Sequence, residues 1–255
     1  MDHICCQWFS NERRIFENVD ARLEGTVMKD RAEARTLAGD AYAVIHRAIR
    51  SGLLKPGQRL RFADLQALCG MSVSPVREAL VRLTAEGFTV SDDHRGFSVA
   101  PLSIAELLDI VGTRKLLEGE ALRLSIEHGD SAWEGRLLAA HHVMSRLPRE
   151  RDDLPTAIRE DWDLRHADFH RVLISACRSP ILIELCEKLF VRADRYRRLS
   201  VSVPNQSRDV VCEHERIMAF ALDRNADGAV AALKEHYQRT ADAVERLFQE
   251  GALVD

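Results

Sequence analysis

The amino-acid sequence predicts a mainly α-helical protein, with an N-terminal winged helix-turn-helix followed by a C-terminal all-helical bundle. Three observations support this fold class. Apolar residues recur at helical spacing along most of the 255 residues, two short β-like segments flank a polar turn before residue 100, and Ser-Pro or S-x-x-E signals begin several helices. The hydrophobic fraction of 46% supplies enough apolar material for a sizeable core.

Composition excludes several other classes of protein. No apolar run approaches the roughly 20 residues that a membrane-spanning helix needs, so we expect no membrane association. The 7 Pro and 13 Gly are too few for a low-complexity or fibrous protein. The six Cys lack C-x-x-C spacing, which favours free thiols in a reducing cytoplasm.

Charge is distributed unevenly along the chain. The net charge is -4, but residues 31–100 hold 10 Lys and Arg against 7 Asp and Glu, whereas residues 101–255 hold 22 against 27. A basic segment before an acidic one indicates two domains with different partners. We therefore divide the chain into an N-terminal extension, a basic winged-helix domain and an acidic helical domain, which span residues 1–35, 36–102 and 103–255.

The N-terminal extension lacks the basic and then apolar pattern of a secretory signal. Met28 precedes a polar, helix-like run, which favours Met28 as the natural start. Residues 1–27 would then be a mis-assigned start or a flexible arm. The alternative is that this segment forms an extra helix.

Residues 36–102 carry the signals of a winged helix-turn-helix. Gly52 ends the first helix, and Gly70-Met71 forms the turn between the second and the third. Ser74 is the expected cap of the third helix, and Pro75 suits its first position. Helices are predicted over residues 36–51, 63–69 and 74–86, and strands over residues 88–90 and 97–99.

The third helix is expected to enter the major groove of DNA, with its N-terminal turn toward the base edges. Arg77 can donate two hydrogen bonds to guanine, whereas Arg82 is better placed for a phosphate. A single Arg is more often a solvated surface charge, but several around one helix-turn-helix favour DNA binding. The candidate DNA-contacting residues are Ser72, Val73, Ser74, Arg77, Arg82, Arg59, Arg61, Arg95 and Gly96.

Residues 103–255 show no β-like alternation and predict six helices in a bundle. Ser103 and Glu106 form a capping box, Asp130 or Ser131 starts the second helix, and Ser179-Pro180 starts the fourth. A polar loop is expected between Pro148 and Pro155. The predicted helices span about residues 103–127, 130–147, 156–177, 180–199, 208–223 and 227–249.

Four histidines lie where three of these helices can bring them together. His166 and His170 share one face of the third helix, His214 is early in the fifth, and His236 is midway along the sixth. Imidazoles from three helices can bind one divalent cation in a bundle core. The alternative is that each His is a surface or satisfied core residue, because spacing alone does not establish convergence.

Four segments of the winged-helix domain stand out: KPGQRL at 55–60, SPVREAL at 74–80, RLTAEG at 82–87 and HRGFSVAPLS at 94–103. They resemble the DNA-binding domain of the GntR family of bacterial transcription regulators. This resemblance implies that Arg77 is the principal base-reading residue. Many relatives carry Arg where this chain has Val73, which indicates a different contact with the operator, such as an apolar contact with a thymine methyl group.

Three segments of the helical domain stand out: TRKLLEGEAL at 113–122, HADFHRVLISACRSPIL at 166–182 and EHERIMAFALDRNADGAVAALKEH at 213–236. With them, residues 103–250 resemble the FCD effector domain of the FadR-type GntR regulators. In metal-binding members of that family, an Asp and three His hold a divalent ion. This resemblance therefore makes the helical domain a candidate metal-dependent sensor.

The resemblance implies a specific set of ligands in this chain. His170, His214 and His236 fall on the three His positions, whereas His166 stands where the family has the Asp. The implied site has four His ligands, or three with His166 turned away. Ligation by nitrogen alone favours Zn or Ni over Mn or Mg. Asp163 is a candidate hydrogen-bond partner for the ligands.

In such domains an arginine clamps a small carboxylate at the open metal position. Arg114, four residues before Glu118, matches the family Arg, and Arg192 and Arg195 are further candidates for effector binding. The alternative for Arg114 is a simple i, i+4 ion pair with Glu118, worth a few tenths of a kcal/mol. His141, His142 and Trp162 are expected to be surface or packing residues.

The predicted function is a ligand-responsive transcriptional repressor with operator DNA and a small carboxylate as partners. We expect a homodimer, because a two-fold operator needs two recognition helices about one DNA turn apart. One alternative is that the metal itself is the signal. Another is a metal-dependent hydrolase, but the chain lacks an H-E-x-x-H motif, a nucleophile elbow and a Gly-rich phosphate loop, which argues against an enzyme.

Overall fold

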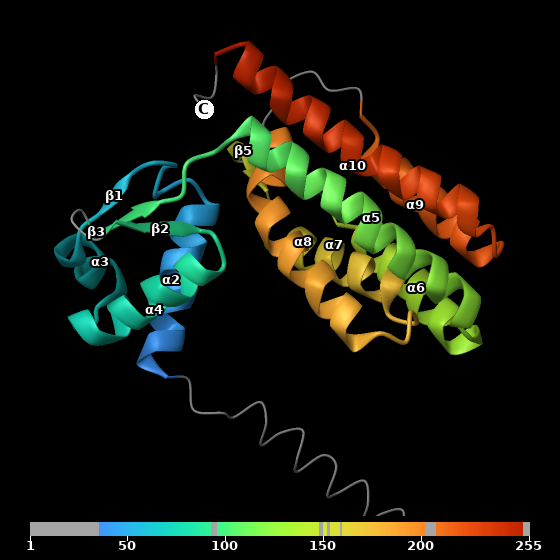
Figure 1. Cartoon of the computed structure of the whole chain (residues 1–255), viewed down its shortest axis with the longest axis horizontal. Helices are drawn as coiled ribbons and strands as arrows, with labels where there is room; N and C mark the ends of the chain where they lie inside the picture. Colours follow the sequence, from blue (N-terminus) through green and yellow to red (C-terminus); the bar gives the residue numbers. More distant parts are fainter. Residues whose placement is uncertain are drawn as a thin grey trace, which may run out of the picture.

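The computed structural model describes residues 36–92, 96–147, 150–151, 154–158, 160–201 and 208–251. In these residues it shows a small helical domain with a three-stranded sheet, followed by a long helical bundle (Figure 1). This arrangement confirms the predicted fold class. The N-terminal extension and Arg95 lie outside the described residues. None of the helices in the described part of the chain is long and apolar enough to span a membrane.

The first domain contains three helices and three strands in the order of a winged helix-turn-helix. They are α2 (Leu37–Arg50), β1 (Arg59–Leu60), α3 (Phe62–Cys69), α4 (Val73–Ala85), β2 (Thr89–Asp92) and β3 (Gly96–Val99). The strand order is β1-β3-β2, and both pairings are antiparallel. The sequence does not reveal β1, because a two-residue strand is too short to show alternation.

Local signals explain most of the helix boundaries in this domain. Thr36 caps α2 by accepting a hydrogen bond from the Gly39 backbone N–H at 3.1 Å. Gly70 ends α3 in the left-handed region at φ 67°, where a residue without a Cβ is favoured. The prediction that Ser74 caps α4 is wrong, since α4 begins one residue earlier, at Val73, with Ser72 in the cap position. Pro75 is tolerated in the first turn because backbone N–H groups there have no partner within the helix.

The helical domain is built from six helices and one short hairpin. They are α5 (Ile104–His128), α6 (Ser131–Ser145), β4 (Glu150–Arg151), β5 (Leu154–Ile158), α7 (Glu160–Ile174), α8 (Pro180–Val201), α9 (Val210–Leu222) and α10 (Ala226–Gln249). Helix α5 packs against α10, α8 and α7, so it runs through the middle of the bundle (Figure 1). This position explains why α5 carries many of the buried residues of the domain.

The hairpin β4–β5 corrects two predictions. We expected a polar loop with no strands here, and a helix that begins near Thr156, but α7 begins at Glu160. Proline restricts the residue before it to extended backbone, and it is tolerated on the edge of a sheet. Pro155 therefore fits β5 of a two-stranded sheet better than it fits a helix start.

Each domain has its own hydrophobic core. In the first domain, Ile45 of α2, Leu65 of α3 and Leu80 of α4 pack against Phe88 and Val99 of the sheet region. In the bundle, large buried residues such as Leu122, Trp133 and Phe169 form a second, longer core. The four cysteines that the structure describes are free, as expected: Cys69, Cys177, Cys186 and Cys212.

Candidate functional site

The N-terminal turn of α4 presents polar side chains to solvent. Ser72, Val73, Ser74 and Arg77 are exposed, whereas the opposite face of the helix packs into the domain core. The guanidinium of Arg77 lies 4.8 Å from the centre of the Phe62 ring, a cation–π contact that leaves its N–H groups available. A helix held in this way can offer its first turn to a DNA groove.

The remaining candidates for DNA contact surround this helix. Arg59 is exposed in β1, Arg61 is exposed just before α3, and Gly96 is exposed at the start of β3 with φ 79°. Arg82 is exposed as well, but its Nε donates to Glu86 Oε1 at 3.0 Å and its guanidinium lies 4.0 Å from the centre of the Tyr42 ring. Arg82 is therefore already engaged within the domain.

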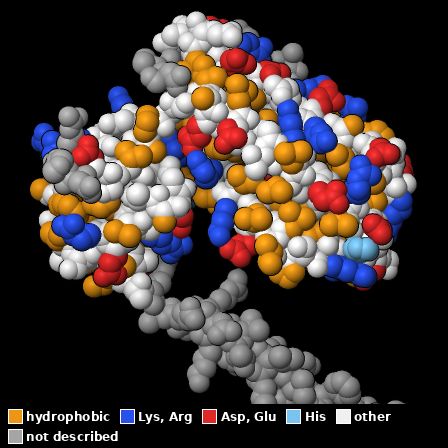
Figure 2. Space-filling view, in the orientation of Figure 1, with side chains coloured by type: hydrophobic (Ala, Val, Ile, Leu, Met, Phe, Trp, Pro, Cys, Tyr) orange, Lys and Arg blue, Asp and Glu red, His pale blue; other side chains and the backbone are white. Residues whose placement is uncertain are grey.

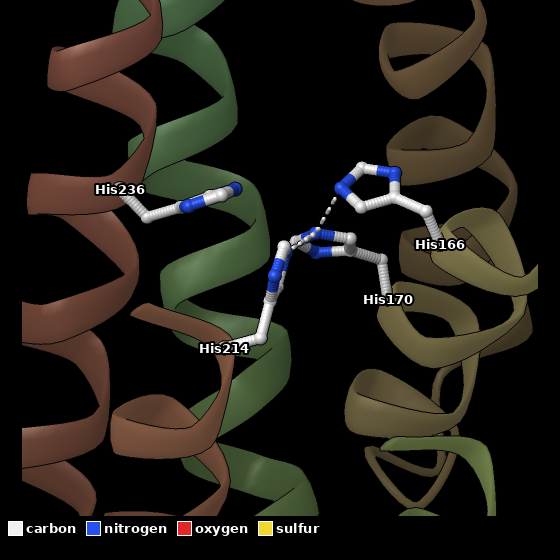
Figure 3. A group of neighbouring side chains, drawn as sticks. All are labelled: His166, His170, His214 and His236. Atoms are coloured by element: carbon white, nitrogen blue, oxygen red, sulfur yellow. Dashed lines mark hydrogen bonds between the residues drawn. The ribbon is translucent and has the colours of Figure 1, made fainter. Parts of the chain in front are cut away.

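The four predicted histidines converge in the bundle core (Figure 3). His166 and His170 come from α7, His214 from α9 and His236 from α10, and each is buried. One ring nitrogen from each lies within 4.8 Å of the others. The Nε2 atom of His170 lies 3.2 Å from His166 Nε2 and 3.3 Å from His214 Nε2. His166 is thus turned toward the other three.

The two shortest of these spacings, from His170 Nε2 to His166 Nε2 and to His214 Nε2, match those of ligands on a tetrahedral metal ion. A Zn–N distance of about 2.0–2.1 Å places two ligand nitrogens about 3.3 Å apart at the tetrahedral angle. The Nδ1 atom of His166 is buried and has no hydrogen-bond partner among the described residues, so the neighbours of this ring lie on its Nε2 side, where His170 is. The four imidazoles therefore fit a divalent ion that prefers nitrogen ligands.

The environment keeps these rings neutral, which is the form that binds a metal. Burial lowers the pKa of His166, His170 and His214 well below its ordinary value, and the neighbouring imidazoles lower it further. Burial also lowers the pKa of His236. Neutral imidazoles this close together offer lone pairs without mutual charge repulsion.

Glu213 is the hydrogen-bond partner behind His236. Its Oε2 lies 2.7 Å from His236 Nδ1, and it also accepts from Arg208 at 2.7 Å. Burial would raise the pKa of Glu213, but Arg208 and His236 hold it below its ordinary value. A carboxylate in this position fixes the ring of a ligand and leaves Nε2 free for the metal. Glu213 was not among the residues predicted from the sequence, because its only local signal is its place next to His214.

The prediction that Asp163 supports the ligands is wrong. Its carboxylate oxygens accept from Arg197 at 2.6 Å, from Arg50 at 3.5 Å and from Arg198. No hydrogen bond joins Asp163 to a histidine among the residues that the structure describes. Trp162, the residue before it, packs as expected, with its ring stacked on His166 at 4.7 Å between centroids.

Arg114 is buried beside the histidines and pairs with Glu118. Its Nε donates to Glu118 Oε1 at 2.5 Å and its second guanidinium nitrogen to Oε2 at 3.2 Å. The Tyr237 hydroxyl also donates to Glu118, and the Arg114 guanidinium lies 4.0 Å from the centre of the Tyr237 ring. Arg114 lines a cavity of about 20 Å³ together with His166, His170 and His236. This cavity holds about one water molecule.

A second, larger cavity of about 190 Å³ opens between α7 and α8. Its polar lining includes His170, Glu118, Arg171 and Glu187, and Ile174 and Phe190 belong to its apolar wall. The two cavities share His170. Space for an organic molecule therefore lies next to the histidine cluster.

Arg192 and Arg195 do not lie at either cavity. Arg195 donates to the backbone carbonyls of Gly87, Ala100 and Pro101 at 2.9, 2.7 and 2.8 Å. Arg192 donates to Glu106 Oε1 at 2.7 Å. Arg195 is thus used at the contact between the domains, whereas Arg192 pairs within the bundle. Arg197, which the sequence analysis did not select, lines the cavity beside His166 and His236.

Two family models match the chain. The model for bacterial regulatory proteins of the gntR family matches residues 37–99, and the model for the FCD domain matches residues 109–239. These matches cover the helix-turn-helix with its wing and the part of the bundle that holds all four histidines.

Relatives and solved structures agree with these matches. An uncharacterised HTH-type transcriptional regulator, BphR of Paraburkholderia xenovorans, is 33% identical over 84% of this chain and 88% of its own. The HTH-type transcriptional repressor GlaR of Escherichia coli is 33% identical over 77% of this chain and 90% of its own. The structure of E. coli McbR/YncC has a TM-score of 0.64 at 22% identity, over 84% of this chain and 99% of its own.

A winged helix with an exposed recognition helix and a bundle with a buried histidine cluster thus coincide with the two family matches. The matches with BphR and GlaR cover most of the length of each relative, and both relatives are named as regulators of transcription. The chain therefore belongs to the gntR family of bacterial regulatory proteins, as a DNA-binding transcriptional regulator with an FCD effector-binding domain.

Proposed function

We propose that this regulator is a homodimeric repressor whose affinity for operator DNA is set by a small carboxylate at a metal centre in the FCD domain. The single observation that carries the proposal is the convergence of four buried His nitrogens within 4.8 Å. The repressor GlaR, at 33% identity, is a relative in which repression is the named activity.

DNA binding is assigned to the exposed side of α4 and the basic residues around it. We propose Arg77 as the main base-reading residue, with Ser72, Val73 and Ser74 at the base edges. Arg59, Arg61 and Gly96 would approach the backbone or the adjacent groove, as would Arg95, and Arg82 is proposed for a phosphate contact. Two such surfaces, related by the two-fold axis of a dimer, would match a two-fold operator.

The metal would be held by His166, His170, His214 and His236, with Glu213 fixing the ring of His236. Ligation by four nitrogens favours Zn or Ni. When bound, the metal supplies an additional coordination position for a carboxylate oxygen, since four-coordinate Zn can expand to five ligands.

Arg114 is the proposed partner of the effector carboxylate. Its side chain lines the cavity beside three of the four histidines. Glu118 already occupies two of its donor nitrogens, which holds the guanidinium in a fixed orientation. The apolar wall of the larger cavity offers room for the rest of the effector.

A second candidate function keeps the regulator but makes the metal the signal. The metal cavity itself has space for little more than one water molecule, which favours this reading over a bulky effector at that point. The two candidates differ in whether a carboxylate changes operator affinity at saturating metal. The family and the relatives indicate a transcriptional regulator rather than an enzyme and give the hydrolase alternative no support.

The test uses full-length protein without an affinity tag. Elemental analysis and calorimetry with Zn²⁺ and Ni²⁺ should show about one metal per chain, and His214→Ala should lose it. The matched control is His142→Ala on the exposed side of α6, which should bind as the wild type does. Wild-type protein that takes up no metal would contradict the proposal. Operator affinity is then measured at saturating metal, with and without carboxylates, and sedimentation gives the oligomeric state.

A further inference from the structure

The last turns of α8 join the two domains. Arg195 binds the carbonyl of Gly87, directly after the recognition helix, and those of Ala100 and Pro101, directly after the wing. Figure 2 shows basic and acidic side chains next to each other where the domains meet. The contact therefore involves both ends of the segment that carries the wing.

A buried ionic cluster crosses the same contact. Arg50, at the end of α2, lies 2.8 Å from Asp194 of α8 and 3.5 Å from Asp163 of α7. Arg197 and Arg198 of α8 bind the same two carboxylates. Three guanidinium groups thus share two carboxylates. The Asp side chains are 3% and 8% exposed, so solvent screens these charges little.

Arg197 links this cluster to the histidines. Its guanidinium donates to Asp194 at 2.5 Å and to Asp163 at 2.6 Å, and the same side chain lines the cavity with His166 and His236. It also lies 5.5 Å from the centre of the Trp162 ring, which stacks on His166. One guanidinium therefore faces both the proposed effector cavity and the acidic pair.

We infer that Arg197 couples the effector cavity to the orientation of the winged-helix domain. A carboxylate in the cavity neutralises part of the charge of Arg197, and Asp163 and Asp194 then attract Arg50 more strongly. Arg197 and Arg50 lie close together because they share these two carboxylates. When the charge of Arg197 is partly neutralised, Arg197 also repels Arg50 less. Effector binding thus tightens the contact between the domains. This inference rests on the proposed function, since it needs an anion at the histidine cluster.

Hydrogen–deuterium exchange of residues 48–54 and 96–102 tests the inference. The probes are Zn²⁺ alone, and then acetate, succinate or citrate added to the zinc-loaded protein. In the wild type, a carboxylate that binds should slow exchange at this contact at least about fivefold, the lower end of typical allosteric coupling. In Arg50→Gln, the slowing of exchange that a carboxylate causes should be less than about twofold. Because coupling between two sites is reciprocal, the affinity for the carboxylate should fall by the same factor by which this slowing is reduced.

Two further variants separate coupling from a general loss of structure. Arg123→Gln, which breaks an exposed ion pair with Asp227 far along the bundle, should respond as the wild type does. Arg50→Lys keeps the charge but loses the planar fork, so it should restore part of the response. If Arg50→Gln does not fold, Asp194→Asn removes the same contact from the other side.

The outcomes distinguish the inference from the proposed function. Full carboxylate-induced protection in Arg50→Gln would overturn the inference, as would a wild-type protein that binds a carboxylate with no change in exchange. Failure of the wild type to bind Zn²⁺, or any of the three carboxylates when loaded, would overturn the proposed function and the inference with it. Calorimetry on the same samples shows which of these holds.

Discussion

The same sequence pattern, Arg followed four residues later by Glu, occurs in both domains with opposite consequences. In the recognition helix, Arg82 and Glu86 form an ion pair at 3.0 Å whose side chains are 61% and 29% exposed. In α5, Arg114 and Glu118 pair at 2.5 Å with exposures of 10% and 4%. Exposed pairs of this kind contribute little to stability, whereas breaking a buried pair leaves an uncompensated charge.

This difference extends to the two domains as a whole. Among the described residues, Thr89 is the buried polar side chain of the winged-helix domain, whereas the bundle buries Arg114, Glu118, Asp163, Asp194 and all four clustered histidines. The polar and charged side chains of the first domain thus lie mostly on its surface, where DNA can reach them. Those of the candidate site in the bundle lie in its core, so substitutions there affect function and stability together.

The largest expected effect separates the two ion pairs. Glu118→Ala should destabilise the protein by about 3–5 kcal/mol, because Arg114 is left buried without its carboxylate. Arg82→Gln, which breaks the exposed pair, should cost less than about 1 kcal/mol. Urea denaturation measures both. Equal losses of stability would contradict the comparison.

A second prediction concerns the surface chemistry of the winged-helix domain. Arg77→Ala should weaken binding to the specific operator by about 1–3 kcal/mol, or roughly 5- to 150-fold, and abolish the sequence-specific footprint. The melting temperature should stay unchanged, since Arg77 is exposed. Footprinting and thermal unfolding are measured on the same protein, with the exposed bundle variant Arg171→Ala as control. A wild-type footprint would rule out base reading by Arg77.

A third prediction sharpens the role of the bundle core. Glu213→Gln should lower the affinity for Zn²⁺ by about 10- to 100-fold, because His236 loses the carboxylate that orients its ring. The control is Glu235→Gln, a neighbouring surface glutamate that pairs with Arg216 and Arg239. Calorimetric titration measures the affinity. Unchanged zinc affinity in Glu213→Gln would show that the hydrogen bond plays no part in metal binding.

The smallest expected effect tests His46 of the first domain, whose Nε2 atom is buried. The His46 ring stacks on Tyr42 and meets the Phe88 ring edge-on, and burial lowers its pKa to about 4. Below pH 6.5 the unfolded chain takes up a proton that folded His46 does not, so stability is full above pH 6.5 and falls toward pH 4.

Between pH 7 and pH 5.5, the free energy of unfolding of the wild type should fall by about 1 kcal/mol more than that of His46→Phe. The reason is that the phenylalanine of the variant cannot take up a proton in the unfolded chain. Thermal unfolding of both proteins at the two pH values measures it. Parallel pH dependences would mean that His46 is as easily protonated in the folded domain as in the unfolded chain.

Prediction from sequence succeeded where short-range signals decide the outcome. Helical spacing located the recognition helix, and the position of His170, His214 and His236 on separate helices anticipated their convergence. It failed where the partner lies far along the chain. Arg195 was expected at the effector site, but its donors bind carbonyls of Gly87, Ala100 and Pro101, which are 94–108 residues away along the chain.

The sequence by itself determined the order of the helices, the family and the identity of the four clustered histidines, because periodicity, caps and local motifs act over a few residues. Only the tertiary structure decided which Arg–Glu pair is buried, that Glu213 rather than Asp163 supports a histidine, and that α8 joins the two domains. Burial and charge partners depend on how distant helices pack, and spacing along the chain does not encode that packing.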